Sequence, residues 1–230
     1  QAGSVEAFVQ KDLFNPERQI LGQEQEAWLQ NELQTSRARG ATWQVLGQQV
    51  LMGKLNIPVI PPEELAQLKL SEHAQPRVDQ AQQLAPYGLP VNLDAWDGYP
   101  AARTRLFDML SAHATNPISL AGDTHNSWAF NMTNTKGEAV GVEWGTPSIS
   151  SPSIEEWVPL PPEQMQTLLK GTNPELVACD VSQRGWTKIA LTPEAATAQW
   201  RFVSTVIEPD YRSQSGPEFI VDAGDRRLKA

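Results

Sequence analysis

A predicted amphipathic helix is followed, after a short loop, by an apolar strand, and this order constrains the fold more than any other feature. Between Pro100 and His113, apolar side chains recur at intervals of three and four residues, which predicts a helix with one buried face. Residues 118–121 are apolar at nearly every position and have polar neighbours, as expected for a strand covered on both faces. Helix, loop and buried strand in succession indicate an α/β sheet.

Further helices and strands are predicted on both sides of this unit. Residues 23–39 form a helix that can end at Gly40, and a shorter helix begins at Pro161 and ends at Gly171. Helices alternate with strands at first and strand pairs follow, which favours two packed sheets over one doubly wound sheet. We therefore expect an α/β fold, a two-sheet sandwich flanked by helices. The other strands are predicted at residues 43–46, 140–144, 175–181, 186–191 and 199–206.

Two stretches carry the residues of turns and loops. Residues 57–90 contain many prolines with glutamines between them, which predicts a long loop or insertion with at most one short helix, at residues 63–68. Residues 192–194, Thr-Pro-Glu, either begin a helix or form a turn.

The composition excludes several classes of protein. A chain of 230 residues with 40% hydrophobic and 20% charged residues can bury a core and differs from a disordered tract. Its formal net charge of −9 argues against a generic nucleic-acid-binding face. Cys179 is its one cysteine, which excludes an internal disulfide and a cysteine-rich metal site. No apolar run is long enough to span a membrane, and because the chain begins at Gln1 without a signal peptide, we expect a processed or partial polypeptide.

Asp123 and His125 are the strongest candidates for chemistry. They follow Gly122 at the carboxyl end of the predicted strand 118–121, where α/β sheets place their ligand-binding crevice. In an extended segment residues i and i+2 project to the same side, so a carboxylate and an imidazole could face one metal ion or two adjacent ions. An aspartate after a strand also forms turns, and a lone histidine is usually a surface or hydrogen-bonded residue, so spacing alone favours a structural role.

A family resemblance instead favours a functional role for Asp123 and His125. Residues 122–128, Gly-Asp-Thr-His-Asn-Ser-Trp, resemble the Gly-Asp-x-His motif of the metal site in the alkaline phosphatase D (PhoD-like) family of metallophosphatases. Other segments resemble family motifs in the same order, and together they cover nearly the whole chain apart from residues 57–90. These segments are residues 18–29, residues 43–50, residues 94–99 with Arg103, residues 143–151 and residues 185–202.

The resemblance implies a metallophosphatase-like α/β/β/α fold and a metal-dependent phosphoric ester hydrolase. Asp123 and His125 would be metal ligands, and a metal-activated hydroxide would attack a phosphomonoester or phosphodiester without a phospho-enzyme. Iron with calcium is the metal pair that the family suggests, whereas zinc or manganese occupies more ordinary dinuclear sites. The resemblance also suggests a secreted, periplasmic or cell-surface protein.

Three further residues are candidates for substrate binding. Asn126 either donates to a phosphate oxygen or caps a turn, and Arg103 is either a phosphate clamp or an exposed helix residue. Gln49 is expected beside the substrate or behind a ligand, because an amide is a weak ligand itself. Residues 96–99 either line the entrance of the site or pack in the core.

The chain lacks the other motifs that the family site requires, namely an upstream Asp or Cys cluster and an Asn-Asp-His-Glu-type segment. We therefore expect residues 1–230 to be the C-terminal portion of a larger catalytic domain, inactive without its upstream half. The alternative is a non-catalytic protein that retains the sandwich and binds a carbohydrate or a partner through Trp96, Trp128 and Trp144.

Overall fold

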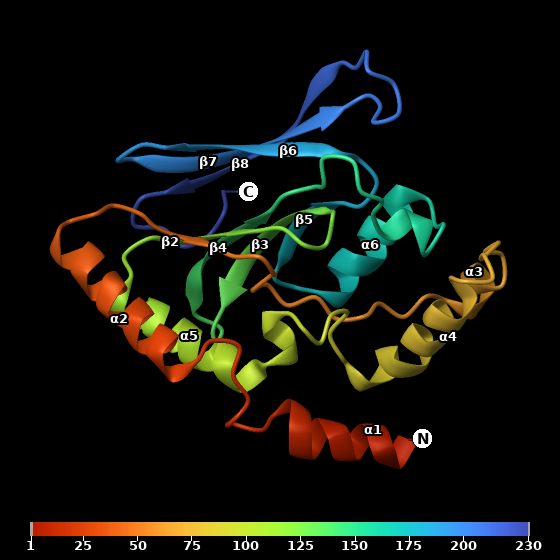
Figure 1. The fold of residues 1–230 in the computed structure, drawn as a ribbon, viewed down its shortest axis with the longest axis horizontal. Helices are drawn as coiled ribbons and strands as arrows, with labels where there is room; N and C mark the ends of the chain where they lie inside the picture. Colours follow the sequence, from red (N-terminus) through yellow and green to blue (C-terminus); the bar gives the residue numbers. More distant parts are fainter. Residues whose placement is uncertain (1, 230) are drawn as a thin grey trace.

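The computed structural model describes residues 2–229, which form two β-sheets and a set of flanking helices (Figure 1). The larger sheet has the strand order β1-β2-β4-β3-β5, and the smaller sheet has the order β6-β7-β8. The strands are β1 (Gln44–Gly47), β2 (Pro117–Ala121), β3 (Ser127–Thr133), β4 (Ala139–Gly145), β5 (Leu176–Asp180), β6 (Gly185–Leu191), β7 (Ala195–Val203) and β8 (Ser213–Asp222).

The helices α2 and α5 cover one face of the larger sheet, and the smaller sheet lies over the other face (Figure 1). Between the sheets, Trp144 of β4 packs with Trp200 of β7 in one apolar cluster. The predicted α/β fold with two sheets and flanking helices is therefore confirmed. The α-helices are α1 (Ala2–Phe8), α2 (Gln23–Ala38), α3 (Pro62–Leu65), α4 (Gln75–Leu84), α5 (Pro100–His113) and α6 (Pro162–Thr172), with short helices at Val9–Leu13, Ala85–Tyr87, Trp96–Gly98 and Ile154–Glu156.

One edge of the larger sheet collects the carboxyl ends of four strands. β1, β2 and β4 are parallel, and β5 runs in the same direction because both β4 and β5 pair antiparallel with β3. Ala121 pairs with Gly145, and Ser127 pairs with Asp180. The loop of residues 122–126 therefore crosses the end of β4 on its way from β2 to β3.

The prediction of at most one short helix within residues 57–90 is wrong. This stretch holds α3 and also α4, which spans 10 residues. Pro76 lies in the first turn of α4, where a proline is tolerated because its missing N–H would be unpaired in any case. The turn option for residues 192–194 is correct, since the Thr192 amide donates to the Ala195 carbonyl at 2.9 Å.

Two strands, β3 and β8, lack a clear sequence pattern. β3 is buried along most of its length, so no polar alternation marks it, and β8 begins with exposed polar residues. Within residues 2–229, no helix has the length and apolar character that crossing a bilayer requires.

Candidate metal site at the sheet edge

The loop of residues 122–126 adopts a tight turn in place of the extended geometry that the sequence suggested. Asp123 has φ 67° and His125 has φ 63°, both in the left-handed region. The amide of Thr124 donates to the carbonyl of Gly122 at 2.8 Å. Left-handed backbone costs a residue other than glycine on the order of 1 kcal/mol, although Asp, Asn and His tolerate it better than most. The prediction that i, i+2 spacing in a strand aligns the two side chains is therefore wrong.

The turn nevertheless brings both side chains to one pocket. Asp123, His125 and Asn126 all line a hollow of about 240 Å³ at the carboxyl edge of the larger sheet. Asp123 and His125 are exposed, whereas Asn126 is buried. The structure thus brings together three of the five predicted site residues.

The imidazole of His125 is held in one orientation and one tautomer. Its Nδ1 lies 2.8 Å from the carbonyl oxygen of Pro152. A carbonyl oxygen only accepts hydrogen bonds, so Nδ1 carries the proton and the lone pair of the neutral ring lies on Nε2. Histidines that bind metals commonly donate their second nitrogen to a backbone carbonyl in this way. His125 is therefore suited to bind a metal ion through Nε2.

Two side-chain hydrogen bonds tie the loop of residues 122–126 to neighbouring parts of the protein. The Asn126 Nδ2 donates to Ser153 Oγ at 2.6 Å, and Trp128 Nε1 donates to Thr124 Oγ1 at 2.6 Å. The Asn126–Ser153 bond is buried, and the Trp128–Thr124 bond is partly buried. They fix the turn that carries the carboxylate and the imidazole.

The structure does not bring Arg103 and Gln49 into this pocket. The Arg103 guanidinium donates to the Glu175 carboxylate at 2.9 Å and to the Met52 carbonyl at 2.7 Å. It also lies 4.1 Å from the centre of the Phe107 ring. Gln49 is exposed in the loop after β1. Arg103 therefore acts here as a connector between α5, the loop after β1 and the start of β5.

A buried glutamate that the sequence analysis did not single out organises that same loop. Glu143 of β4 is fully buried, and its two carboxylate oxygens accept hydrogen bonds from the amides of Met52 at 2.8 Å and Gly53 at 2.7 Å. Ser119 of β2 donates to it as well, at 2.8 Å. Burial raises the pKa of this carboxyl. In the sequence, Glu143 could have been recognised as an acidic residue within the otherwise apolar strand predicted at residues 140–144.

The buried carboxylate of Asp97 holds the next residues of the loop after β1 in the same way, by accepting a backbone hydrogen bond. Its carboxylate accepts the Leu55 amide at 2.9 Å. Burial raises its pKa from 3.8 to about 6, against the opposing effects of this hydrogen bond and the charge of Arg103. The option that residues 96–99 pack in the core is supported, since Trp96, Asp97 and Gly98 are buried.

The raised pKa of Asp97 predicts a pH-dependent stability that Asp97→Asn removes. Between about pH 4 and pH 6 the folded protein keeps a proton that the unfolded chain has already released, so the side chain destabilises the fold increasingly as pH rises. We expect the unfolding free energy of the variant, relative to the wild type, to increase by about 2–3 kcal/mol from pH 4 to pH 7.5. Urea unfolding at several pH values measures this difference, and parallel curves for the two proteins would contradict it.

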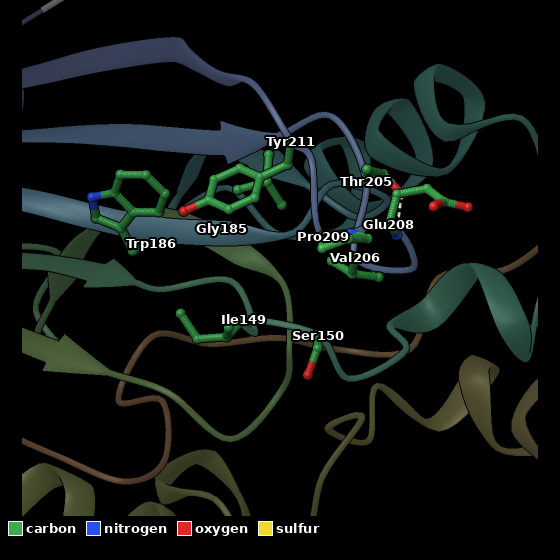
Figure 2. A pocket seen from close by; sticks show the side chains of 10 residues that line it. Ile149, Ser150, Gly185, Trp186, Thr205, Val206, Glu208, Pro209 and Tyr211 are labelled. Atoms are coloured by element: carbon green, nitrogen blue, oxygen red, sulfur yellow. Dashed lines mark hydrogen bonds between the residues drawn. The ribbon is translucent and has the colours of Figure 1, made fainter.

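A second hollow lies between β6 and the loop that precedes β8 (Figure 2). Ile149 and Ser150 face Trp186, Tyr211 and the loop residues across this pocket of about 360 Å³. Trp186 and Tyr211 are partly exposed.

The tryptophan surface predicted for a carbohydrate-binding protein is absent. Trp96, Trp128 and Trp144 are each only 1% exposed. Their indoles fill the core instead.

Asp123 and His125 offer two donors of the kinds that metal ions take. Among residues 2–229, no three His, Cys, Asp or Glu side chains gather into a group able to hold an ion. A stable site needs at least three or four donors. The pair therefore fits one part of a metal site, with a hard anionic oxygen and a directed nitrogen.

Comparison with known proteins identifies the family of the chain. The model of the PhoD-like phosphatase family matches residues 2–200. The alkaline phosphatase D of Bacillus subtilis (strain 168) is 30% identical over 220 residues, which are 94% of this chain and 32% of that protein. A solved structure of PhoD superposes with a TM-score of 0.68 at 26% identity and covers 94% of this chain and 36% of that one. The chain thus spans about a third of the length of these relatives, and it belongs to the PhoD-like phosphatase family.

Proposed function

We propose that this chain contributes to a metal-dependent phosphoric ester hydrolase in which Asp123 and His125 hold a metal ion. The observation that carries the proposal is the His125–Pro152 hydrogen bond, which leaves Nε2 free at a pocket that Asp123 also lines. Membership in a phosphatase family supplies the reaction class. Phosphomonoesters and phosphodiesters are both suitable substrates.

The two side chains have distinct tasks. The Asp123 carboxylate provides a hard, bridging oxygen that suits calcium, and the imidazole of His125 suits iron or zinc. When bound, the metal supplies an activated water and positive charge for the phosphoryl group. Further donors come, in this proposal, from the part of a longer polypeptide that the relatives possess and this chain does not span.

In this proposal, the phosphoryl group of the substrate is bound by side chains of the same pocket. Asn126 uses one amide hydrogen on Ser153, so the second can donate to a substrate oxygen. Arg103 and Gln49 lie outside the pocket and would reach a substrate only after leaving their present positions. A location outside the cytoplasm stays a prediction from the family resemblance.

Removal of metal tests the proposal. We expect a chelator to reduce hydrolysis of p-nitrophenyl phosphate and bis(p-nitrophenyl) phosphate by at least about a hundredfold in the natural polypeptide that contains this chain. Adding back iron with calcium, or zinc or manganese, should restore turnover, and elemental analysis identifies the metal. Full turnover by protein shown to be metal-free would contradict the proposal. Absence of both bound metal and turnover in the natural polypeptide would also contradict the proposal.

A further inference from the structure

We propose that an apolar cavity beside the Asp123–His125 pocket binds an alkyl or aryl group of the phosphoester substrate. This cavity of about 390 Å³ lies between α4, the 3-10 helix at Ile154–Glu156 and α6. The inference rests on the proposed function, because it assigns a substrate class to the same site. Its evidence is the set of residues that line both hollows and the chemistry of the cavity wall.

The cavity and the metal pocket share part of their walls. Pro58, Val91, Ile154 and Trp157 line both. The two hollows are therefore neighbours, separated by no more than these four side chains. In this proposal, a substrate whose phosphoryl group lies beside Asp123 and His125 extends an ester group past them into the cavity.

The cavity wall is mainly apolar, and the amide side chain that lines it, that of Gln82, is hydrogen-bonded within the protein. Val78, Ile60 and Met165 contribute hydrocarbon surface from α4, the preceding loop and α6. The Gln82 amide group is bonded at both ends, since its oxygen accepts the Ile60 amide at 2.7 Å and its nitrogen donates to the Pro58 carbonyl at 3.1 Å. These two bonds tie Gln82 to the loop before α3, so its side chain is held as part of the cavity wall.

Arg77 is the one ionisable side chain among the described residues that line the cavity. Its guanidinium carbon lies 4.2 Å from the centre of the Trp157 ring. This stacking holds the indole in place on the wall that both hollows share. Because no acidic side chain lines the cavity, nothing in its wall repels an anionic phosphoester, and an apolar group gains affinity by leaving water.

The test compares methyl and octyl phosphoesters in the natural polypeptide. Each methylene that becomes buried is expected to raise kcat/KM by about fourfold, so octyl phosphate should exceed methyl phosphate by at least about thirtyfold. Ala81→Glu introduces a carboxylate into the cavity wall and should reduce this preference by at least about tenfold. Gln80→Glu, an exposed change on the same helix that does not line the cavity, should keep it.

Different failures separate this inference from the proposed function. Equal kcat/KM for methyl and octyl esters would overturn the apolar subsite and leave the hydrolase intact, as would an undiminished preference in Ala81→Glu. If neither ester is hydrolysed, the proposed function fails, and calorimetry with octylphosphonate and methylphosphonate decides the inference. Tighter binding of octylphosphonate that Ala81→Glu abolishes would support the subsite, and equal binding would overturn it.

Discussion

Replacing His125 by asparagine should remove bound metal and lower phosphoester hydrolysis by at least about a hundredfold, with a change in unfolding free energy below about 1 kcal/mol. Asparagine tolerates the left-handed backbone at φ 63°. Its amide can still donate to the Pro152 carbonyl, which accepts from His125 Nδ1 in the wild type. The variant therefore removes the Nε2 donor while the turn is retained. Elemental analysis, steady-state kinetics and urea unfolding measure the three quantities.

A second histidine provides the matched control for this experiment. His113 lies at the end of α5 and does not line the pocket, so His113→Asn should keep both metal and turnover. Asp123→Asn should resemble His125→Asn, because it keeps a side chain suited to φ 67° and removes the anionic oxygen. Undiminished turnover and metal content in His125→Asn would refute the assignment of the site.

Replacing Glu143 by alanine should lower the unfolding free energy by about 3–5 kcal/mol. The change leaves the buried amides of Met52 and Gly53 and the hydroxyl of Ser119 without their acceptor. It also leaves a cavity in the core, because Glu143 lies in β4, which is buried at nearly every position. We expect the loop after β1 to lose its fixed position, because its amides have no regular strand partner there.

Two comparisons separate the loss of hydrogen bonds from a general effect of mutation. Glu143→Gln keeps one acceptor oxygen and most of the volume, so it should cost about 1–3 kcal/mol, less than the alanine variant. Glu194→Ala removes an exposed glutamate in the turn between β6 and β7 and should stay within about 0.5 kcal/mol of the wild type. Denaturant unfolding gives all three values. A loss below about 1 kcal/mol for Glu143→Ala would show that the loop finds other acceptors.

The fold could be predicted where periodicity is strong. The helix expected at residues 100–113 is α5 with the same limits, and the apolar run 118–121 lies within β2. Prediction failed where burial removes the pattern, as in β3, and where a proline at a helix start resembles a helix breaker, as in α4. These failures follow from tertiary contacts that a local pattern does not contain.

The site was only partly accessible from the sequence. Asp123 and His125 were predicted from their position after a strand and from a motif resemblance, but the backbone that carries them is a left-handed turn. The hydrogen bonds from Met52 to Glu143 and from Leu55 to Asp97 join residues 91 and 42 positions apart. No local pattern marks such pairs, because the sheet topology creates them.

The left-handed turn at residues 123–126 has a consequence for how such a chain evolves. Glycine or asparagine would occupy the positions of Asp123 and His125 at lower conformational cost. Neutral drift in a lineage that had abandoned its chemistry would therefore move both positions toward those residues and gain stability on the way. A descendant that keeps an aspartate and a histidine there keeps their conformational cost as well. Selection for activity, rather than for folding, would maintain these two residues.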